Sequence, residues 1–348
     1  MRPRRVSRLD RPRQRWPGVL LVAVTALVFA VGAPTVEGAA QFGSLGSAHE
    51  WPTPIRHVFV IYFENQEYNT TFANGPYEAS LARTYANASQ YYSYGHYSLP
   101  NYLAATSGLW TNSFQVTRAM NIAHLATSAG LTWKQYSESI PYPCDPTSNG
   151  TYDIYHSPFM MYSYVASNPA RCDRDVVGLS NFTTALDDHA APNYALIVPN
   201  NTDDDHDTNV SVGDAWLQQW LSPILKMPAF KTSVFFITYD EGTTDWGVKG
   251  NNTGGGHLYF VAVSPYANKG YSSPTKYTDF NLLTTTEWLL GLGHTGMNDN
   301  WSQYPPMTDL FNFSGAGSAN VPAGSASVSS PPPGTPLLAG RFDPSGRP

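Results

Sequence analysis

Residues 55–65 read Ile-Arg-His-Val-Phe-Val-Ile-Tyr-Phe-Glu-Asn, a nearly continuous apolar and β-branched run that ends directly in two polar residues. Such a run is typical of a strand buried on both faces of an α/β sheet. Helical patterns follow at 215–225, with Asp214 placed to favour the helix N-terminus, and at 280–292, closed by glycines. Alternating strands and helices predict an α/β fold with a mixed, mostly parallel sheet sandwiched between helices. Three further runs of the strand type lie at 194–198, 233–239 and 258–264.

Polar side chains stand at the ends of two of these buried strands. Glu64 and Asn65 follow the first run, and Asp240 and Glu241 follow the run at 233–239. In open α/β sheets, ligands bind beyond the carboxyl ends of the strands. Carboxylate and amide oxygens are ligands for a divalent cation. Either pair alone reads as ordinary acids at the start of a loop, but together they favour a metal-dependent site.

Residues 94–108 are predicted to form a loop and a helix, with the hydroxyl group of Ser98 at the start of the helix. Pro100 suits a first helical position, and Gly108 stands where a left-handed residue ends a helix. Ser98 is therefore expected just ahead of the helix N-terminus, where free N–H groups attract an anionic group such as phosphate. Ser98 is a candidate nucleophile that needs activation by a base or a metal. The alternative is that Ser98 only caps the helix.

Two further polar stretches follow or precede predicted strands. Residues 199–207, Pro-Asn-Asn-Thr-Asp-Asp-Asp-His-Asp, read as the edge of a site or as a solvated acidic turn. They lack the glycine and closing glutamate of an EF-hand loop. Residues 251–257 end in three glycines and His257, and they allow a backbone to approach a ligand or form a flexible turn. They do not match a P-loop.

The N-terminal segment 1–39 differs from the rest of the chain. Seven arginines precede an apolar run at 18–33, which small residues close. This order predicts a secretory signal, with an uncleaved membrane anchor as the alternative. Removing the segment, with its seven basic and two acidic residues, leaves 13 basic and 24 acidic residues, a net charge of −11. The absence of a basic patch argues against a nucleic-acid partner. We expect a secreted or cell-surface location.

The two cysteines, Cys144 and Cys172, predict one disulfide in an exported chain. The final segment, 315–348, is rich in glycine, serine, alanine and proline, which predicts a disordered tail. These boundaries leave 40–314 as the catalytic domain.

The motifs together resemble the family of bacterial and fungal phosphoesterases, which holds secreted acid phosphatases and phospholipases C within the alkaline-phosphatase-like superfamily. The resemblance extends from about Ile55 to Phe311 and implies an alkaline-phosphatase-like fold. The motifs, in chain order, are 63–68 (Phe-Glu-Asn-Gln-Glu-Tyr), 96–102 (His-Tyr-Ser-Leu-Pro-Asn-Tyr), 156–159 (His-Ser-Pro-Phe), 204–207 (Asp-Asp-His-Asp), 213–217 (Gly-Asp-Ala-Trp-Leu), 238–241 (Thr-Tyr-Asp-Glu) and 254–257 (Gly-Gly-Gly-His).

The resemblance implies roles for individual residues. Ser98 is expected to be the nucleophile that forms a phosphoseryl intermediate, and Asn101 and Asp204 are expected to bind substrate. A divalent metal of unknown identity is expected on Glu64, Asn65, Asp240 and Glu241. Four histidines are expected to donate to the phosphate or to protonate the leaving oxygen, namely His96, His156, His206 and His257.

The chain departs from the family in two respects. Asp279 and Asn281 stand where the family more often has a histidine and a serine. The chain is also short for the phospholipase C branch, which favours an acid phosphatase acting on a small phosphate monoester. The alternatives are a phospholipase C-type phosphodiesterase and a non-catalytic cell-surface binding protein. Membrane contact is expected only if segment 1–39 is uncleaved or the substrate is a lipid.

Overall fold

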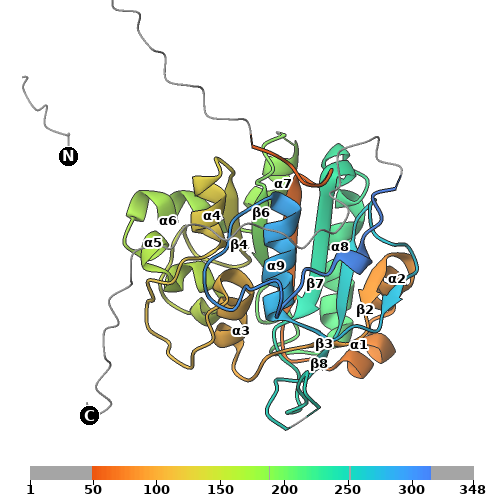
Figure 1. The fold of residues 1–348 in the computed structure, drawn as a ribbon. Helices are drawn as coiled ribbons and strands as arrows, with labels where there is room; N and C mark the ends of the chain where they lie inside the picture. The colour runs from red at the N-terminus through yellow and green to blue at the C-terminus, as the bar shows by residue number, and fades with distance from the viewer. Residues whose placement is uncertain (1–48, 188, 251, 315–348) are drawn as a thin grey trace, which may run out of the picture. The chain divides into compact units, whose positions relative to one another are not determined.

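The computed structural model describes residues 49–187, 189–250 and 252–314, which form the α/β fold of Figure 1. The predicted signal segment 1–39 and the predicted tail 315–348 lie outside these residues. No helix among the described residues is long and apolar enough to cross a membrane.

The main sheet has eight strands in the order β10-β2-β9-β7-β1-β6-β4-β5. Neighbouring strands are parallel except where β9 pairs with β7 and with β2, so the predicted mixed, mostly parallel sheet is confirmed. The strands of this sheet are β1 (His57–Phe63), β2 (Ala86–Ala88), β4 (Trp133–Ser137), β5 (Val176–Gly178), β6 (Tyr194–Val198), β7 (Ser233–Tyr239), β9 (Phe260–Val263) and β10 (Ser272–Ser273).

The predicted strand at 258–264 is divided between two sheets. Its first part belongs to a three-stranded sheet formed by β3 (Tyr91–Tyr92), β8 (His257–Leu258) and β11 (Tyr277–Thr278). Its second part is β9 in the main sheet. The apolar run is continuous because both parts are buried, and composition therefore could not show the break.

The helices pack around the main sheet, with α9 in front of the strands in the view of Figure 1. Helix α9 contacts α3 and β1, whereas α8 contacts α1 and α2. The helices are α1 (Tyr68–Asn74), α2 (Pro76–Thr84), α3 (Ser98–Ser107), α4 (Ile122–Ser128), α5 (Ser163–Ala166), α6 (Pro169–Asp175), α7 (Ser180–Asp187), α8 (Val210–Ile224) and α9 (Asp279–Leu290), with short 3-10 helices at Ile154–His156, Pro158–Met161, Pro228–Thr232 and Thr308–Leu310.

The expectation that Asp214 favours the start of its own helix is wrong. Helix α8 begins at Val210, where Asn209 caps it, so Asp214 lies inside the helix. The Asp214 carboxylate instead accepts the backbone N–H groups of Tyr77 and Glu78, in the first turn of α2. It therefore complements the dipole of a different helix.

Two local predictions about the chain are confirmed. Gly108 ends α3 with a φ of 71°, in the left-handed region that favours glycine. Cys144 and Cys172 form a disulfide.

Candidate active site

The candidate site lies at the carboxyl edge of the two central strands. In the parallel pair β1 and β7, Phe63 lies opposite Tyr239, so Glu64 and Asp240 leave the sheet side by side. The Asp240 N–H donates to the Phe63 carbonyl over 2.9 Å, and the Glu64 N–H donates to the Asp204 carbonyl over 2.8 Å. Three acidic residues that are distant in sequence are thereby brought to one edge.

Ser98 is the first residue of α3, and its hydroxyl points toward the carboxylates. Its Oγ donates to Glu64 Oε2 over 3.0 Å, and the helix start has no side-chain cap. The interpretation of Ser98 as a simple cap therefore does not describe its contacts. Tyr102, one turn further along α3, donates to the other Glu64 oxygen over 2.7 Å. Sequence analysis overlooked Tyr102, although its spacing of four residues from Ser98 places both on one helix face.

His156 and Asp204 complete a compact group around Glu64. His156 Nε2 lies 3.3 Å from Glu64 Oε1, and His156 Nδ1 lies 3.5 Å from Asp204 Oδ2. One ligand atom from each of these three buried residues lies within 4.8 Å of the others, a spacing suited to a metal ion. The structure thus adds His156 and Asp204 to the possible ligands of a cation.

The electrostatics of this group favour a bound cation. Burial raises the pKa of Glu64 well above its ordinary value, and the nearby Asp240 and Asp204 carboxylates raise it further. Burial also raises the pKa values of Asp204 and Asp240. Burial lowers the pKa of His156, but neighbouring carboxylates outweigh that effect and raise it.

Two oxygens of this group, Asp204 Oδ2 and Asp240 Oδ2, are buried and have no hydrogen-bond partner among the described residues. Buried carboxylates in this state require a proton or a positive charge nearby. Among the described residues, no lysine or arginine is ion-paired with Glu64, Asp204 or Asp240. The donor set therefore fits a divalent cation.

Glu241 and His96 form a second pair of contacting side chains in the site. His96 Nδ1 lies 2.6 Å from Glu241 Oε2, and its Nε2 lies 3.3 Å from Asp245 Oδ1. Burial and the Asp240 charge raise the pKa of Glu241 to about 7, although His96 opposes this shift. The structure thus directs Glu241 toward a histidine that is one-third exposed.

Asn65 occupies a strained backbone conformation beside the acidic group. Its φ of 59° lies in the left-handed region, which asparagine tolerates better than most residues. The Asn65 N–H donates to Asp240 Oδ1 over 3.3 Å. This contact joins the two polar pairs that follow β1 and β7.

The other predicted site residues have different neighbours. His206 lies beside Asp207 at 2.8 Å, with its ring centroid 5.6 Å from that of His156. Asn101 is fully buried, and its Nδ2 donates to the carbonyls of Gly95 and Tyr97. It therefore holds the loop that precedes Ser98.

His257 is held within the small sheet rather than against the acidic group. Its ring lies between Tyr68 and Tyr92, and its Nε2 contacts the Ser89 carbonyl at 2.8 Å. Its N–H donates to Glu67, whose carboxylate also accepts the Thr243 and Thr244 N–H groups. Glu67 thereby connects His257 with the segment at 243–244.

The two residues that depart from the family pattern have structural partners. Asp279 is buried and accepts the hydroxyls of Tyr62 and Tyr91 and the N–H of Tyr94. Burial raises its pKa to about 7, although the two tyrosines lower it. Asn281 closes a capping box with Thr278 at the start of α9. Asp279 therefore supports the loop that leads to Ser98.

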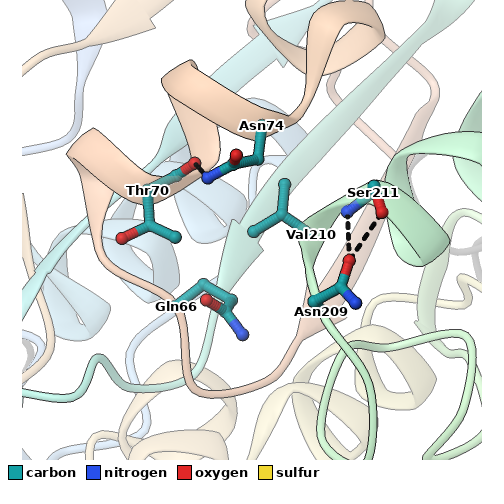
Figure 2. A pocket seen from close by; sticks show the side chains of 6 residues that line it. All are labelled: Gln66, Thr70, Asn74, Asn209, Val210 and Ser211. Carbon is teal, nitrogen blue, oxygen red and sulfur yellow. Dashed lines mark hydrogen bonds between the residues drawn. The ribbon is translucent and has the colours of Figure 1, made fainter.

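A surface hollow of about 260 Å³ lies between α1 and the start of α8 (Figure 2). Its walls are amide, hydroxyl and apolar side chains, none of them ionisable, so it is no site for a phosphate group by itself. None of the predicted site residues lines it. Its lining residues are Gln66, Thr70, Asn74, Asn209, Val210 and Ser211.

A second group with metal-ligand spacing lies in the last turn of α9 and the segment that follows it, and sequence analysis overlooked it. It consists of Glu287, His294 and Asp299, each of which offers one ligand atom within 4.8 Å of the others. Thr295 in the same segment donates to the Ser107 carbonyl, at the opposite end of α3 from Ser98. We call these three residues the α9 cluster.

Two curated proteins are similar to this chain in sequence. A probable acid phosphatase from Kluyveromyces lactis is 28% identical over 260 residues, which are 70% of this chain and 60% of that protein. The chain thus spans less than two thirds of that relative. A phosphatidylinositol-3-phosphatase from Mycobacterium tuberculosis is 29% identical over 317 residues, 88% of this chain and 99% of that protein.

A solved structure supports the fold assignment. A protein of the alkaline phosphatase superfamily from Vibrio parahaemolyticus has a TM-score of 0.53 and 12% identity, with 71% of each chain covered. This likeness concerns the fold alone and confirms the predicted architecture. The model of the Phosphoesterase family matches residues 72–293, inside the predicted catalytic domain. The chain therefore belongs to the Phosphoesterase family, as its motifs predicted.

Proposed function

We propose that this protein is an exported, metal-dependent phosphoesterase of acid phosphatase type, which hydrolyses phosphate monoesters through a phosphoserine on Ser98. The observation that carries the proposal is the Ser98 hydroxyl, 3.0 Å from Glu64 Oε2 at the start of α3. A nucleophile, a buried carboxylate group and a helix N-terminus meet there. Family membership and the names of the relatives support hydrolysis of phosphoric esters.

Four of the residues that would hold a divalent cation follow the ends of β1 and β7, namely Glu64 and Asn65, and Asp240 and Glu241. Asp204, beyond the end of β6, adds a buried oxygen that has no hydrogen-bond partner within the described part of the chain. When bound, such an ion supplies positive charge that lowers the pKa of a hydroxyl and stabilises phosphoryl oxygens.

Side chains and backbone N–H groups of the protein then carry out the phosphoryl transfer. The Ser98 hydroxyl loses its proton to Glu64, and Oγ forms a bond to phosphorus while the bond to the leaving oxygen breaks. The free N–H groups at the start of α3 stabilise the phosphoryl charge. A water molecule then attacks phosphorus and gives a proton to the histidine that protonated the leaving oxygen, the Ser98–phosphorus bond breaks, Glu64 returns its proton to Ser98 Oγ, and inorganic phosphate is released.

Histidines supply the protons for these steps in the proposal. His96 and His206 are each held by a carboxylate and remain partly exposed, at 33% and 38% of the side chain. Either can protonate a leaving oxygen that arrives from solvent. His156 is buried between Glu64 and Asp204 and orients the acidic group instead.

The proposal of export rests on the arginine-rich and apolar segment 1–39. The Cys144–Cys172 disulfide supports it, because disulfides persist mainly in oxidising compartments.

The first experiment compares benzyl phosphate with phosphatidylcholine, a monoester with a choline diester, from pH 4 to 9 in the presence of divalent metals. We expect release of phosphate from the monoester, and loss of activity after chelation with recovery on adding metal. Faster cleavage of the diester would move the protein to the phospholipase C branch. No cleavage of either ester by the folded protein would favour the binding-protein alternative.

A further inference from the structure

A row of three exposed aromatic rings borders the candidate site. Tyr97, Phe114 and Tyr155 are 62%, 38% and 43% exposed. The ring centroids of Tyr97 and Phe114 lie 6.3 Å apart, and those of Phe114 and Tyr155 lie 5.0 Å apart. Three separate segments of the chain therefore contribute to one aromatic surface, which we call the aromatic row.

The two end residues of the aromatic row are sequence neighbours of residues in the candidate site. Tyr97 precedes Ser98, and Tyr155 precedes His156. Ser98 and His156 contact the two oxygens of the same Glu64 carboxylate, at 3.0 Å and 3.3 Å. Because successive Cα atoms are about 3.8 Å apart, the backbones of Tyr97 and Tyr155 lie directly beside those of Ser98 and His156.

Isolated exposed apolar residues are ordinary, but a cluster of them carries information. Single apolar side chains are scattered over most protein surfaces and need no explanation. Here three rings pack edge to face while each keeps a large exposed area, although many other aromatic side chains of the protein are fully buried. Such a surface gains free energy when an apolar group covers it.

The chemistry of the site assigns the two parts of a substrate to different surfaces. The phosphate group belongs with Ser98 and the cation site, where the described side chains are polar or acidic. The group on the ester oxygen must extend away from this position. The aromatic row is an exposed apolar surface whose two end residues precede Ser98 and His156 in sequence, whereas none of the predicted site residues lines the hollow in Figure 2.

We propose that Tyr97, Phe114 and Tyr155 form a subsite for an apolar leaving group, an aryl ring or a hydrocarbon chain attached through the ester oxygen. The subsite rests on the proposed phosphomonoesterase function and names its substrate class. The rings cover the apolar group and remove its surface from water. Hydrolysis leaves an apolar alcohol on the aromatic row and phosphate at the acidic group.

Phe114 is the residue to change, because it contacts both neighbours and is not adjacent in sequence to any predicted catalytic residue. The substrates are benzyl phosphate, decyl phosphate below its micellar concentration, and glycerol 1-phosphate. All three release a primary alcohol, so differences in leaving-group chemistry are small. The matched control is Met297→Ala, which removes another exposed apolar side chain beside Gly108, at the far end of α3.

We expect Phe114→Ala to lower kcat/KM for an apolar ester about tenfold, mainly through KM, and to change that for glycerol 1-phosphate by less than about twofold. Met297→Ala should leave all three values within about twofold. A loss confined to benzyl phosphate assigns an aryl subsite, and a loss confined to decyl phosphate assigns a hydrocarbon subsite. Phe114→Leu should restore decyl phosphate more fully than benzyl phosphate.

Equal losses for all three esters, or no loss for either apolar ester, would overturn the subsite while leaving the proposed function intact. Wild-type protein that hydrolyses none of the three esters would contradict the proposed function, and the subsite with it. Because Phe114 is exposed, the thermal midpoint of the variant should stay close to that of the wild type, which verifies that the fold is retained.

Discussion

Two groups among the described residues have the same three residue types, and their surroundings differ. Glu64, His156 and Asp204 form one, and the α9 cluster forms the other. Each has one histidine and two carboxylates with ligand atoms within 4.8 Å. In the first group the histidine side chain is 4% exposed, whereas His294 is 46% exposed.

The partners of the carboxylates separate the two groups further. Asp299 Oδ2 accepts the Thr295 hydroxyl, the Thr295 N–H and the Gly296 N–H, so the protein itself satisfies it. Glu287 Oε2 faces His294 and Trp301, whereas Glu287 Oε1 is buried and has no hydrogen-bond partner among the described residues, as is also true of one Asp204 oxygen in the first group. The first group differs by a third carboxylate, Asp240, and by the Ser98 hydroxyl that contacts Glu64. Residue types alone therefore do not distinguish the two groups, whereas the neighbouring hydroxyl and the third carboxylate do.

The first group contacts the proposed nucleophile, Ser98, whereas the segment that carries the α9 cluster contacts the C-terminal end of α3. Thr295 and Asn298 donate to the carbonyls of Ser107 and Gly108 at the C-terminal end of α3. The segment between His294 and Asp299 thereby holds the end of the helix that begins at Ser98. The two groups lie at opposite ends of a ten-residue helix, about 15 Å long.

The largest expected effect comes from Ser98→Ala. We expect kcat/KM for a phosphate monoester to fall at least about a thousandfold, because the nucleophile is lost. Ser107→Ala, at the other end of α3, is the matched control and should keep its activity within about threefold. Steady-state kinetics and thermal unfolding of both variants provide the measurement. Activity of Ser98→Ala close to wild type would remove Ser98 as the nucleophile.

The next effect is on metal binding. Asp240→Asn removes a charge from the proposed cation site, and we expect metal affinity to fall about 100-fold or more, with activity following it. Asp299→Asn in the α9 cluster should leave calorimetric binding of Mn²⁺ or Zn²⁺ unchanged. If Asp299→Asn abolished binding and Asp240→Asn did not, the assignment of the two groups would be reversed.

A smaller effect concerns stability and pH. Burial raises the pKa of Glu287 from 4.5 to about 7, although His294 opposes this shift. The folded state therefore holds a proton that the unfolded state releases, so this contribution is complete below about pH 4.5 and is lost as pH rises through about 7. The raised pKa of His294 acts in the same direction.

We expect Glu287→Gln to remove this dependence. Between pH 4.5 and 7.5, the wild type should lose on the order of 2 kcal/mol more unfolding free energy than the variant. Urea unfolding at several pH values tests this, and parallel curves for the two proteins would argue against the assignment.

The smallest effect is expected for Thr295→Val. The change removes the hydroxyl that bonds the Ser107 carbonyl and Asp299, and should cost about 1 kcal/mol of unfolding free energy. Catalysis should stay within about twofold of wild type, since the change lies at the end of α3 away from Ser98. A tenfold loss of kcat would instead connect the α9 cluster to the chemistry.

The sequence predicted the central strands and their polar ends because continuous apolar runs and abrupt polar residues are local signals. Residues 57–63 and 233–239 are strands, and the register of Phe63 with Tyr239 follows from their parallel pairing. The division at 258–264 and the role of Asp214 depend on tertiary partners, which composition does not show. Asp214, for example, serves the first turn of α2 across 136 residues of chain.

The candidate site was predictable only in part. Glu64, Asp240 and Ser98 were identified from strand ends and a helix start. The closeness of His156 to Glu64 depends on a 3-10 helix at 154–156 that has no periodic signal. The predicted roles of Asn101 and His257 rested on the resemblance, and their contacts with backbone carbonyls appear only in the fold.

The central claim is that Ser98 becomes phosphorylated during turnover. The direct measurement mixes the protein with excess monoester, quenches in acid within milliseconds to seconds, and maps phosphate by peptide mass spectrometry. We predict one phosphoryl group on Ser98, absent from Ser98→Ala and from chelated protein. A protein that turns over the ester rapidly with no phosphate on Ser98, or with phosphate on another residue, would contradict the account.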